Sequence, residues 1–301
     1  MQTVFVTGAN GFVGAYVVKA LLERNYFVVA SGRGKNGPEY NHPNLRYRAL
    51  DFTDKEMTAT VFYDVRPNVV VHCGAMSKPD DCELNKAAAV LTNVAGTRNL
   101  LDEAGKLKAH FIFLSTDFVF SGEGEGMYKE DDERSPVNYY GQTKVLAENE
   151  VMNYVFDWAI VRTVLVYGKS LGEKESFIEM VVRSAKQQKA LKIFNDQLRT
   201  PTYVADLAGG IERVIAKKAT GIFHLSGKDP ITVYQAACNA VTLNNLDASF
   251  ISPITEGDLP APARRPKITG FYLDKAKREL SYNPVSFADG LQKTFELNAS
   301  S

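Results

Sequence analysis

The chain has 301 residues with 35 basic and 35 acidic side chains, so it carries no formal net charge. This balance argues against nucleic acid or an anionic membrane surface as a partner. The 45% hydrophobic content is typical of a globular protein, and no apolar run approaches the roughly 20 residues that span a bilayer. Without the basic and apolar regions of a signal peptide, a cytoplasmic location is expected. Three cysteines without a C-x-x-C pair and four scattered histidines predict no disulfide framework and no metal site.

The chain begins with a strand, a glycine-rich turn and a helix. A strand is expected at 3–7 and a helix at 12–24, and the turn between them has the pattern G-x-x-G-x-x-G. This is a variant of the dinucleotide fingerprint, in which glycines let backbone amides approach a pyrophosphate at the positive end of a helix. The residues predicted to bind a dinucleotide cofactor here are Gly8, Asn10, Gly11, Phe12, Val13 and Gly14.

The second strand, expected at 26–31, ends in a basic loop. NAD-selective sites usually carry an acidic residue at this point, which bonds the ribose 2′-hydroxyl. This chain instead has Ser31 and Arg33, whose hydroxyl and guanidinium groups suit a 2′-phosphate. We therefore predict that NADP(H) is preferred over NAD(H), with a solvated basic loop as the alternative interpretation.

Strands and helices continue to alternate through the first half of the chain. Strands are expected at 45–49, 68–72, 110–115 and 158–163, and helices at 54–65, 83–106 and 138–155. Continuous apolar runs such as 69–71 are typical of strands that are buried on both faces. Repeated βα units predict an α/β fold with a doubly wound, Rossmann-like parallel sheet.

Beyond residue 165 the alternation becomes less regular, and four prolines mark an irregular stretch between 253 and 266. The elements expected here are a helix near 173–189, a strand at 191–194, a helix at 203–217 and a strand at 221–225. We expect the last two to return to the first domain. The predicted dinucleotide-binding domain is therefore 1–165 plus about 203–226, and about 166–202 plus 227–301 form a smaller substrate-binding region.

The middle of the chain carries a candidate catalytic set. Thr116 and Asp117 follow a buried strand, at the sheet edge where open α/β folds bind ligands. Tyr140 and Lys144 are four residues apart on a predicted helix, so their side chains share one face. There the ammonium could hold the phenol, whose pKa is ordinarily about 10, near ionisation. A loop expected at 121–136 lies between these groups and is placed to fold over a ligand.

Together, the glycine motif, Ser115-Thr116-Asp117, Tyr140 and Lys144 resemble the extended short-chain dehydrogenase/reductases that act on nucleotide-linked sugars. The runs S-T-D-F-V-F-S-G from Ser115 and P-V-N-Y-Y-G-Q-T-K from Pro136 resemble the dTDP-4-dehydrorhamnose reductase branch. The segments 161–168, 199–208 and 264–267 fit the same branch. This resemblance covers the chain from residue 3 to about 292.

The resemblance implies roles for individual residues. Tyr140 is expected to exchange a proton with the sugar oxygen, Lys144 to tune Tyr140 and bond the nicotinamide ribose, and Thr116 to bind the reacting oxygen beside Asp117. The other cofactor contacts that it implies are Asp51, Phe52, Gly74, Ala75, Met76 and Asn93. The substrate contacts that it implies are Ser77, Phe118, Arg199, Arg264 and Arg265.

The activity that the resemblance implies is NADP(H)-dependent reduction of a nucleotide-linked 4-keto-6-deoxy sugar, and it leaves a homodimer open. The chain departs from the branch at Phe118, where tyrosine is usual, and at Leu165, where tryptophan is frequent, so the sugar stays open. One alternative is an epimerase or dehydratase of the same fold. Dehydratases commonly have a second acid at the position of Phe118, so its absence favours reduction. The other alternative is a cofactor-binding regulatory subunit, like that of methionine adenosyltransferase.

Overall fold

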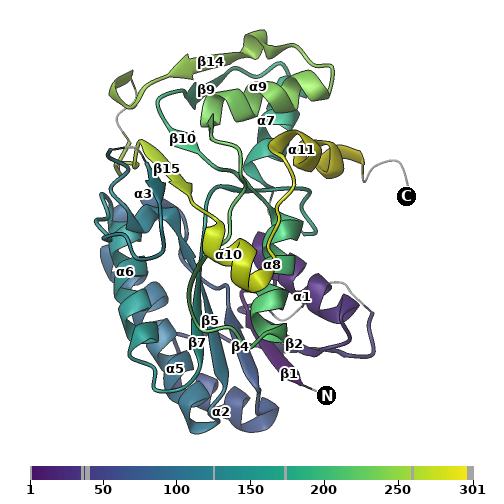
Figure 1. The fold of residues 1–301 in the computed structure, drawn as a ribbon, viewed down its shortest axis with the longest axis vertical. Helices are drawn as coiled ribbons and strands as arrows, with labels where there is room; N and C mark the ends of the chain where they lie inside the picture. The colour runs from purple at the N-terminus through teal and green to yellow at the C-terminus, as the bar shows by residue number, and fades with distance from the viewer. Residues whose placement is uncertain are drawn as a thin grey trace.

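The fold has two parts, a large sheet covered by helices and a smaller region stacked on one end of that sheet (Figure 1). The computed structural model describes residues 2–34, 37, 41–124, 126–172, 175–258 and 261–296. Parts of the loop expected after the second strand, and the start of the helix expected near 173–189, lie outside the described residues.

Seven parallel strands form the large sheet, in the order β12-β7-β5-β4-β1-β2-β3. Their bounds are β1 (Thr3–Thr7), β2 (Phe27–Gly32), β3 (Leu45–Ala49), β4 (Val69–His72), β5 (His110–Thr116), β7 (Trp158–Thr163) and β12 (Gly221–His224). The strand order reverses between β1 and β4, which creates a crevice for a ligand at the carboxyl edge. The predicted doubly wound, Rossmann-like α/β fold is thus confirmed. The strand expected at 221–225 joins this sheet by pairing with β7.

Helices cover both faces of the sheet (Figure 1). Their bounds are α1 (Phe12–Glu23) and α8 (Val204–Ala216) on one face, and α2 (Lys55–Val65), α5 (Gly96–Lys106) and α6 (Tyr139–Met152) on the other. Within β1, Val4 and Val6 pack into the core beneath α1 and α8, whereas Phe5 packs into the core of the opposite face. Continuous apolar runs are needed because both faces of these strands are covered.

The long helix expected at 83–106 is instead built from several pieces. They are α3 (Pro79–Leu84), α4 (Lys86–Val90), a π-helical turn (Leu91–Ala95) and α5. Asn85, with φ −129° and ψ 59°, leaves the helical conformation and separates α3 from α4. The π-helical turn places Asn93 in the interior. Such turns are frequent at functional sites. Asn93 of this turn bonds Met76, in the segment that follows β4.

The smaller region is assembled from segments that are distant in the sequence. Its helices are α7 (Phe177–Lys186), α9 (Val233–Leu243) and α11 (Phe287–Glu296), whereas α10 (Asp274–Leu280) packs on α8 and β12 of the large part. A four-stranded sheet has the order β13 (Ile231–Thr232), β10 (Leu198–Arg199), β15 (Ile268–Phe271) and β6 (Met127–Tyr128), and the remaining pairs are β14 (Ile251–Ile254) with β9 (Leu191–Phe194) and β11 (Thr202–Tyr203) with β8 (Val166–Tyr167).

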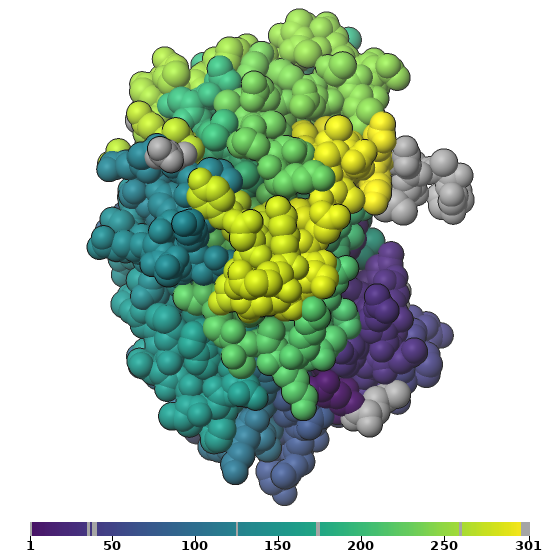
Figure 2. Space-filling view, in the orientation of Figure 1, coloured from purple at the N-terminus to yellow at the C-terminus, as the bar shows by residue number. Residues whose placement is uncertain are grey.

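Two segments tie the parts together. The segment expected to be a loop at 121–136 contains β6, which pairs with β15 of the smaller region. The last residues run across the front of the molecule between the two parts, as Figure 2 shows in yellow, with α10 against α8 and β12 and α11 against α9. The residue ranges of the two domains remain a prediction, because both parts share these segments.

Among the described residues, none of the helices combines the length and the apolar character that crossing a bilayer requires. The same residues contain no group of three or more His, Cys, Asp or Glu side chains that could hold a metal ion. The cytoplasmic location and the homodimer remain predictions.

We expect Gly14→Ala to reduce the free energy of unfolding by about 1–3 kcal/mol or more, because a Cβ at Gly14 would lie 2.2 Å from the carbonyl oxygen of Gly8 and push α1 off the sheet. Urea unfolding measures this effect. Gly209→Ala in α8 is the matched control, because its Cβ meets no atom within 4 Å. It should stabilise the protein by about 0.5–1 kcal/mol. Equal stability of the Gly14 variant and the wild type would show that this close approach is not required.

Candidate active site

The glycine turn after β1 forms a cradle for a charged group. Gly8 has φ +65°, and a Cβ there would lie 2.7 Å from the backbone nitrogen of Gly74. Helix α1 begins after Gly11, with no side-chain hydrogen bond to its N-cap and no acidic residue in its first turn. The backbone N–H groups of Phe12 and Val13, at the positive end of α1, are therefore available to bind an anion. This backbone geometry fits a pyrophosphate.

The end of β2 is fixed by a tyrosine that the sequence did not single out. The hydroxyl of Tyr47 on β3 lies 2.6 Å from the carbonyl oxygen of Gly34 and 3.1 Å from that of Gly32, and it accepts a hydrogen bond from Asn10. Ser31 is buried at the strand end, and Arg33 is exposed just beyond it. Tyr47 thus links the glycine turn to the backbone on both sides of Arg33.

The floor of the site is held by buried hydrogen bonds. The Asn93 side chain accepts a bond from the Met76 amide (2.8 Å) and donates to the Met76 carbonyl (3.0 Å) and to the Thr143 hydroxyl (2.9 Å). Its amide group is therefore used by the protein, and Asn93 positions the segment that contains Gly74 and Ala75. This contact also links the floor to α6.

Three other predicted residues lie around this floor. The Phe52 ring fills the space beside Gly74, where a Cβ would lie 2.6 Å from the ring. The Asp51 carboxylate accepts two bonds from Thr53, and Ser77 is exposed. The predicted cofactor residues are therefore gathered around the carboxyl ends of β1, β2 and β4.

Thr116, Asp117 and Tyr140 meet at the end of β5. The Thr116 hydroxyl donates to the Asp117 carboxylate (3.0 Å) and accepts from the Phe118 amide (3.2 Å), and its proximity to the Tyr140 phenol lowers the pKa of that phenol. Asn138 caps the start of α6 by accepting a bond from the Gly141 amide, which fixes Tyr140 in the first turn. The structure thus brings the predicted catalytic hydroxyl groups together.

Lys144 is buried one turn along α6 from Tyr140. Its ammonium donates to the Leu114 carbonyl (2.7 Å) and lies 3.8 Å from the centre of the Phe113 ring. Burial lowers the pKa of Lys144 to about 7, and the Glu148 carboxylate opposes this shift. A lysine in this environment can change protonation near neutral pH.

The pKa of the Tyr140 phenol differs from the expectation. The sequence predicts that Lys144 holds it near ionisation, but burial and the negative charge of Asp117 raise the pKa of Tyr140, and the Thr116 hydroxyl opposes them only in part. The phenol therefore keeps its proton at neutral pH. It is suited to donating a proton rather than accepting one.

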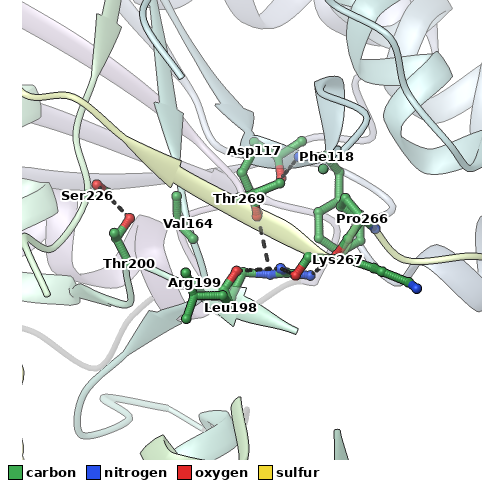
Figure 3. Close-up of polar contacts among 12 residues, drawn as sticks. Asp117, Phe118, Val164, Leu198, Arg199, Thr200, Ser226, Pro266, Lys267 and Thr269 are labelled. Atoms are coloured by element: carbon green, nitrogen blue, oxygen red, sulfur yellow. Dashed lines mark hydrogen bonds and ion pairs between the residues drawn. The ribbon is translucent and has the colours of Figure 1, made fainter. Parts of the chain in front are cut away.

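Arg199 lies inside the protein and does not present an open cation (Figure 3). Its guanidinium donates to the carbonyl oxygens of Leu198 (2.7 Å), Lys267 (3.0 Å) and Pro266 (2.6 Å). Its Nε lies 3.7 Å from the Asp117 carboxylate, which also accepts a hydrogen bond from Thr269. Burial raises the pKa of Asp117, whereas Arg199 lowers it. Arg199 therefore connects the smaller region to Asp117.

A cleft of about 390 Å³ opens beside Asp117 and Phe118. The Phe118 ring contacts the Tyr140 ring edge-on at 5.9 Å between centroids. The two adjacent arginines predicted to bind substrate, Arg264 and Arg265, differ in their position relative to this cleft. Arg265 lines the cleft and pairs with Asp80 at 2.7 Å, whereas Arg264 is exposed and is not among the lining residues.

Comparison with known proteins places this site in a family. The family model described as the RmlD substrate binding domain matches residues 1–299. The chain belongs to this family, within the extended short-chain dehydrogenase/reductases. The resemblance inferred from the sequence is confirmed.

Relatives in this family have different names. The chain is 32% identical over 284 residues to the β subunit of rat methionine adenosyltransferase 2, which covers 92% of this chain and 82% of that protein. It is 28% identical over 289 residues to a probable low-salt glycan biosynthesis reductase of Haloferax volcanii, covering 95% of each. The crystal structure of dTDP-4-dehydrorhamnose reductase from Bacillus anthracis, in complex with NADP, aligns with a TM-score of 0.87 and 27% identity over 99% of this chain and 100% of that one.

Some residues of the site escaped the sequence analysis. Phe177, Phe194, Gln197 and Val233 line the cleft from the smaller region, and Lys192 adds a cation. Lys192 and Phe194 come from β9 and Gln197 from the turn after it, whereas Phe177 and Val233 come from α7 and α9, so no single sequence motif connects them. Only the fold brings them beside Phe118.

We expect the stability difference between Lys144→Met and the wild type to depend on pH. The folded-state pKa of Lys144, about 7, lies below its ordinary value of 10.5. Below pH 7 the cost of burying the cation is therefore fully present, and between these two values it falls as pH rises. The advantage of the methionine variant should shrink by roughly 2 kcal/mol between pH 6 and 9. Urea unfolding of the cofactor-free protein checks this, and a constant difference would contradict it.

Proposed function

We propose that the protein uses NADPH to reduce the ketone of a nucleotide-linked 4-keto-6-deoxy sugar. The observation that supports this most is the position of Tyr140. Its protonated phenol lies near the Thr116 hydroxyl, and its ring contacts Phe118, which lines the cleft. A ketone held in the cleft next to Phe118 would meet a proton donor beside a second hydroxyl.

The cofactor in this proposal is a nicotinamide dinucleotide, with NADP(H) preferred. The glycine turn and the free end of α1 would hold its pyrophosphate, and Ser31 and Arg33 its 2′-phosphate. When bound, it supplies the hydride. In this scheme residues 1–165 plus about 203–226 bind the cofactor, and about 166–202 plus 227–301 bind most of the substrate.

Four side chains would carry out proton transfer and hold the ketone oxygen. Tyr140 donates its proton to the ketone oxygen as the carbon is reduced, and Thr116 holds that oxygen in place. Asp117 keeps the pKa of Tyr140 high, which maintains the phenol in its donating form. Lys144, whose pKa is lowered to about 7, can return a proton to Tyr140 at neutral pH.

Two other activities compete with reduction. A dehydratase would need a second acid beside Asp117, but that place holds the Phe118 ring, packed edge-on against Tyr140. A regulatory subunit without turnover is favoured by the 32% identity to the methionine adenosyltransferase 2 β subunit. NADPH consumption with a panel of 4-keto-6-deoxy sugar nucleotides distinguishes these activities, because only a reductase consumes the cofactor in proportion to the sugar.

We expect Tyr140→Phe to reduce turnover by about 10²–10⁴-fold, because the general acid is lost, while NADPH affinity stays nearly unchanged. Steady-state NADPH consumption and fluorescence titration measure the two quantities. The control is Tyr139→Phe, since the Tyr139 ring contacts Lys86 on another side of the helix. Near-wild-type turnover in the Tyr140 variant would remove this residue from the mechanism.

NADP(H) should bind more tightly than NAD(H), and Arg33→Ala should narrow the gap by about 10-fold, because a charge-assisted bond to the 2′-phosphate is lost. Calorimetry with each cofactor tests this. Arg24→Ala, an exposed arginine at the end of α1, is the matched control. Equal affinities for both cofactors, unaffected by the Arg33 substitution, would show that the loop is only solvated.

The substrate diphosphate should meet Arg265 rather than Arg264, because only Arg265 lines the cleft. Arg265→Ala should weaken binding of the nucleotide sugar by about 10-fold, the loss expected for a charge-assisted phosphate contact. Arg264→Ala is the control, and NADPH affinity should not change in either variant. The assignment is wrong if the two variants bind the nucleotide sugar equally well.

A further inference from the structure

The turn between β9 and β10 carries side-chain polar groups that have no hydrogen-bond partner among the described residues. Gln197 is 6% exposed and lines the cleft, and its carboxamide has no hydrogen bond to any described residue. The preceding Asp196 has one carboxylate oxygen that is buried and lacks a partner in the same part of the chain. Buried polar groups in folded proteins are almost always hydrogen-bonded. The Gln197 carboxamide is not among these fully buried atoms, so it remains accessible from the cleft that Gln197 lines and can pair with a ligand there.

Gln197 lines the cleft from the smaller region, two residues before Arg199. The reacting end is marked by Asp117 and Phe118, which follow β5 and lie beside Tyr140. Gln197 belongs to the smaller region, where its carbonyl accepts a hydrogen bond from the Val233 amide at 3.0 Å. If the sugar carbon reacts beside Tyr140, the nucleotide portion of the same substrate would extend toward Gln197.

The surroundings of Gln197 match the chemistry of a nucleoside diphosphate. Phe177, Phe194 and Val233 supply apolar walls for a flat ring. A carboxamide has one acceptor beside one donor, the complement of the edge of a nucleobase. Lys192 and Arg265 line the same cleft and supply positive charge for phosphate groups.

We propose that Gln197 is a specificity-determining residue that binds the nucleobase edge of the nucleotide-linked substrate through its carboxamide. The proposal rests on the proposed function for the class of ligand alone, and it does not depend on the reaction. A ligand without a base makes no hydrogen bond to the carboxamide, whereas a bound base would bury and pair it. Such loss of a buried hydrogen bond is what gives a site strong discrimination.

Calorimetry on the NADP-saturated protein tests this, because NADP excludes the probes from the cofactor site. The probes are UDP, TDP, GDP and CDP, with pyrophosphate as the probe that has no base. The wild type should bind at least one nucleoside diphosphate about 10-fold or more tightly than pyrophosphate. Gln197→Leu should remove most of that difference and leave pyrophosphate binding unchanged.

Two further variants guard against a structural explanation. Gln197→Glu keeps the size of the side chain and replaces its donor by an acceptor, so it should also weaken binding of the nucleoside diphosphate. Gln292→Leu, on the exposed side of α11, is the matched control and should bind all probes like the wild type. Because the Gln197 carboxamide bonds no described residue, its leucine variant should unfold at the same temperature as the wild type or a higher one.

The outcomes distinguish this inference from the proposed function. Unchanged nucleoside diphosphate affinity in Gln197→Leu would overturn the inference, and so would a wild type that binds pyrophosphate as well as every nucleoside diphosphate. Either result could accompany normal reduction of a keto-sugar nucleotide, which would leave the proposed function standing. Conversely, the expected loss of base binding without turnover of any keto-sugar would support the role of Gln197 and reject the reductase.

Discussion

The buried ion pair between Asp117 and Arg199 is the interaction on which the arrangement of the site depends. Each charge is removed from water, so losing either partner would leave the other uncompensated, at a cost of about 3–5 kcal/mol. Arg199 comes from the smaller region and is also bonded to the carbonyls of Pro266 and Lys267, whereas Asp117 follows β5 of the large sheet. The pair therefore helps to fix the position of the smaller region, which forms one wall of the cleft, relative to Thr116.

The same pair influences the chemistry of the site. Asp117 contributes a negative charge that raises the pKa of Tyr140, and Arg199 opposes the rise in the pKa of Asp117 itself. Burial acts in the opposite sense on Lys144, whose pKa falls to about 7. A protonated phenol at Tyr140 suits the proposed transfer of a proton to a ketone.

The sequence predicted the large sheet, the glycine turn and the meeting of the Thr116 and Tyr140 hydroxyl groups, because each rests on a local pattern of apolar runs or fixed spacings. It did not predict the π-helical turn, whose Asn93 contacts Met76, because this contact leaves no pattern in the sequence. The position of Arg199 could not be predicted either, because its acceptors are backbone carbonyls that carry no side-chain signal. The raised pKa of Tyr140 required knowledge of its burial.

The path of β6 has a consequence for the autonomy of the two parts. This strand lies between β5 and α6 in the sequence but pairs with β15, more than a hundred residues later. A fragment that ended after β7 would leave β6 without its neighbour and expose the edge of β7 that β12 covers. Unpaired edges of this kind invite association with other chains. The large sheet is therefore expected to need the C-terminal half of the polypeptide to fold as a monodisperse species, although the two parts look separable in outline.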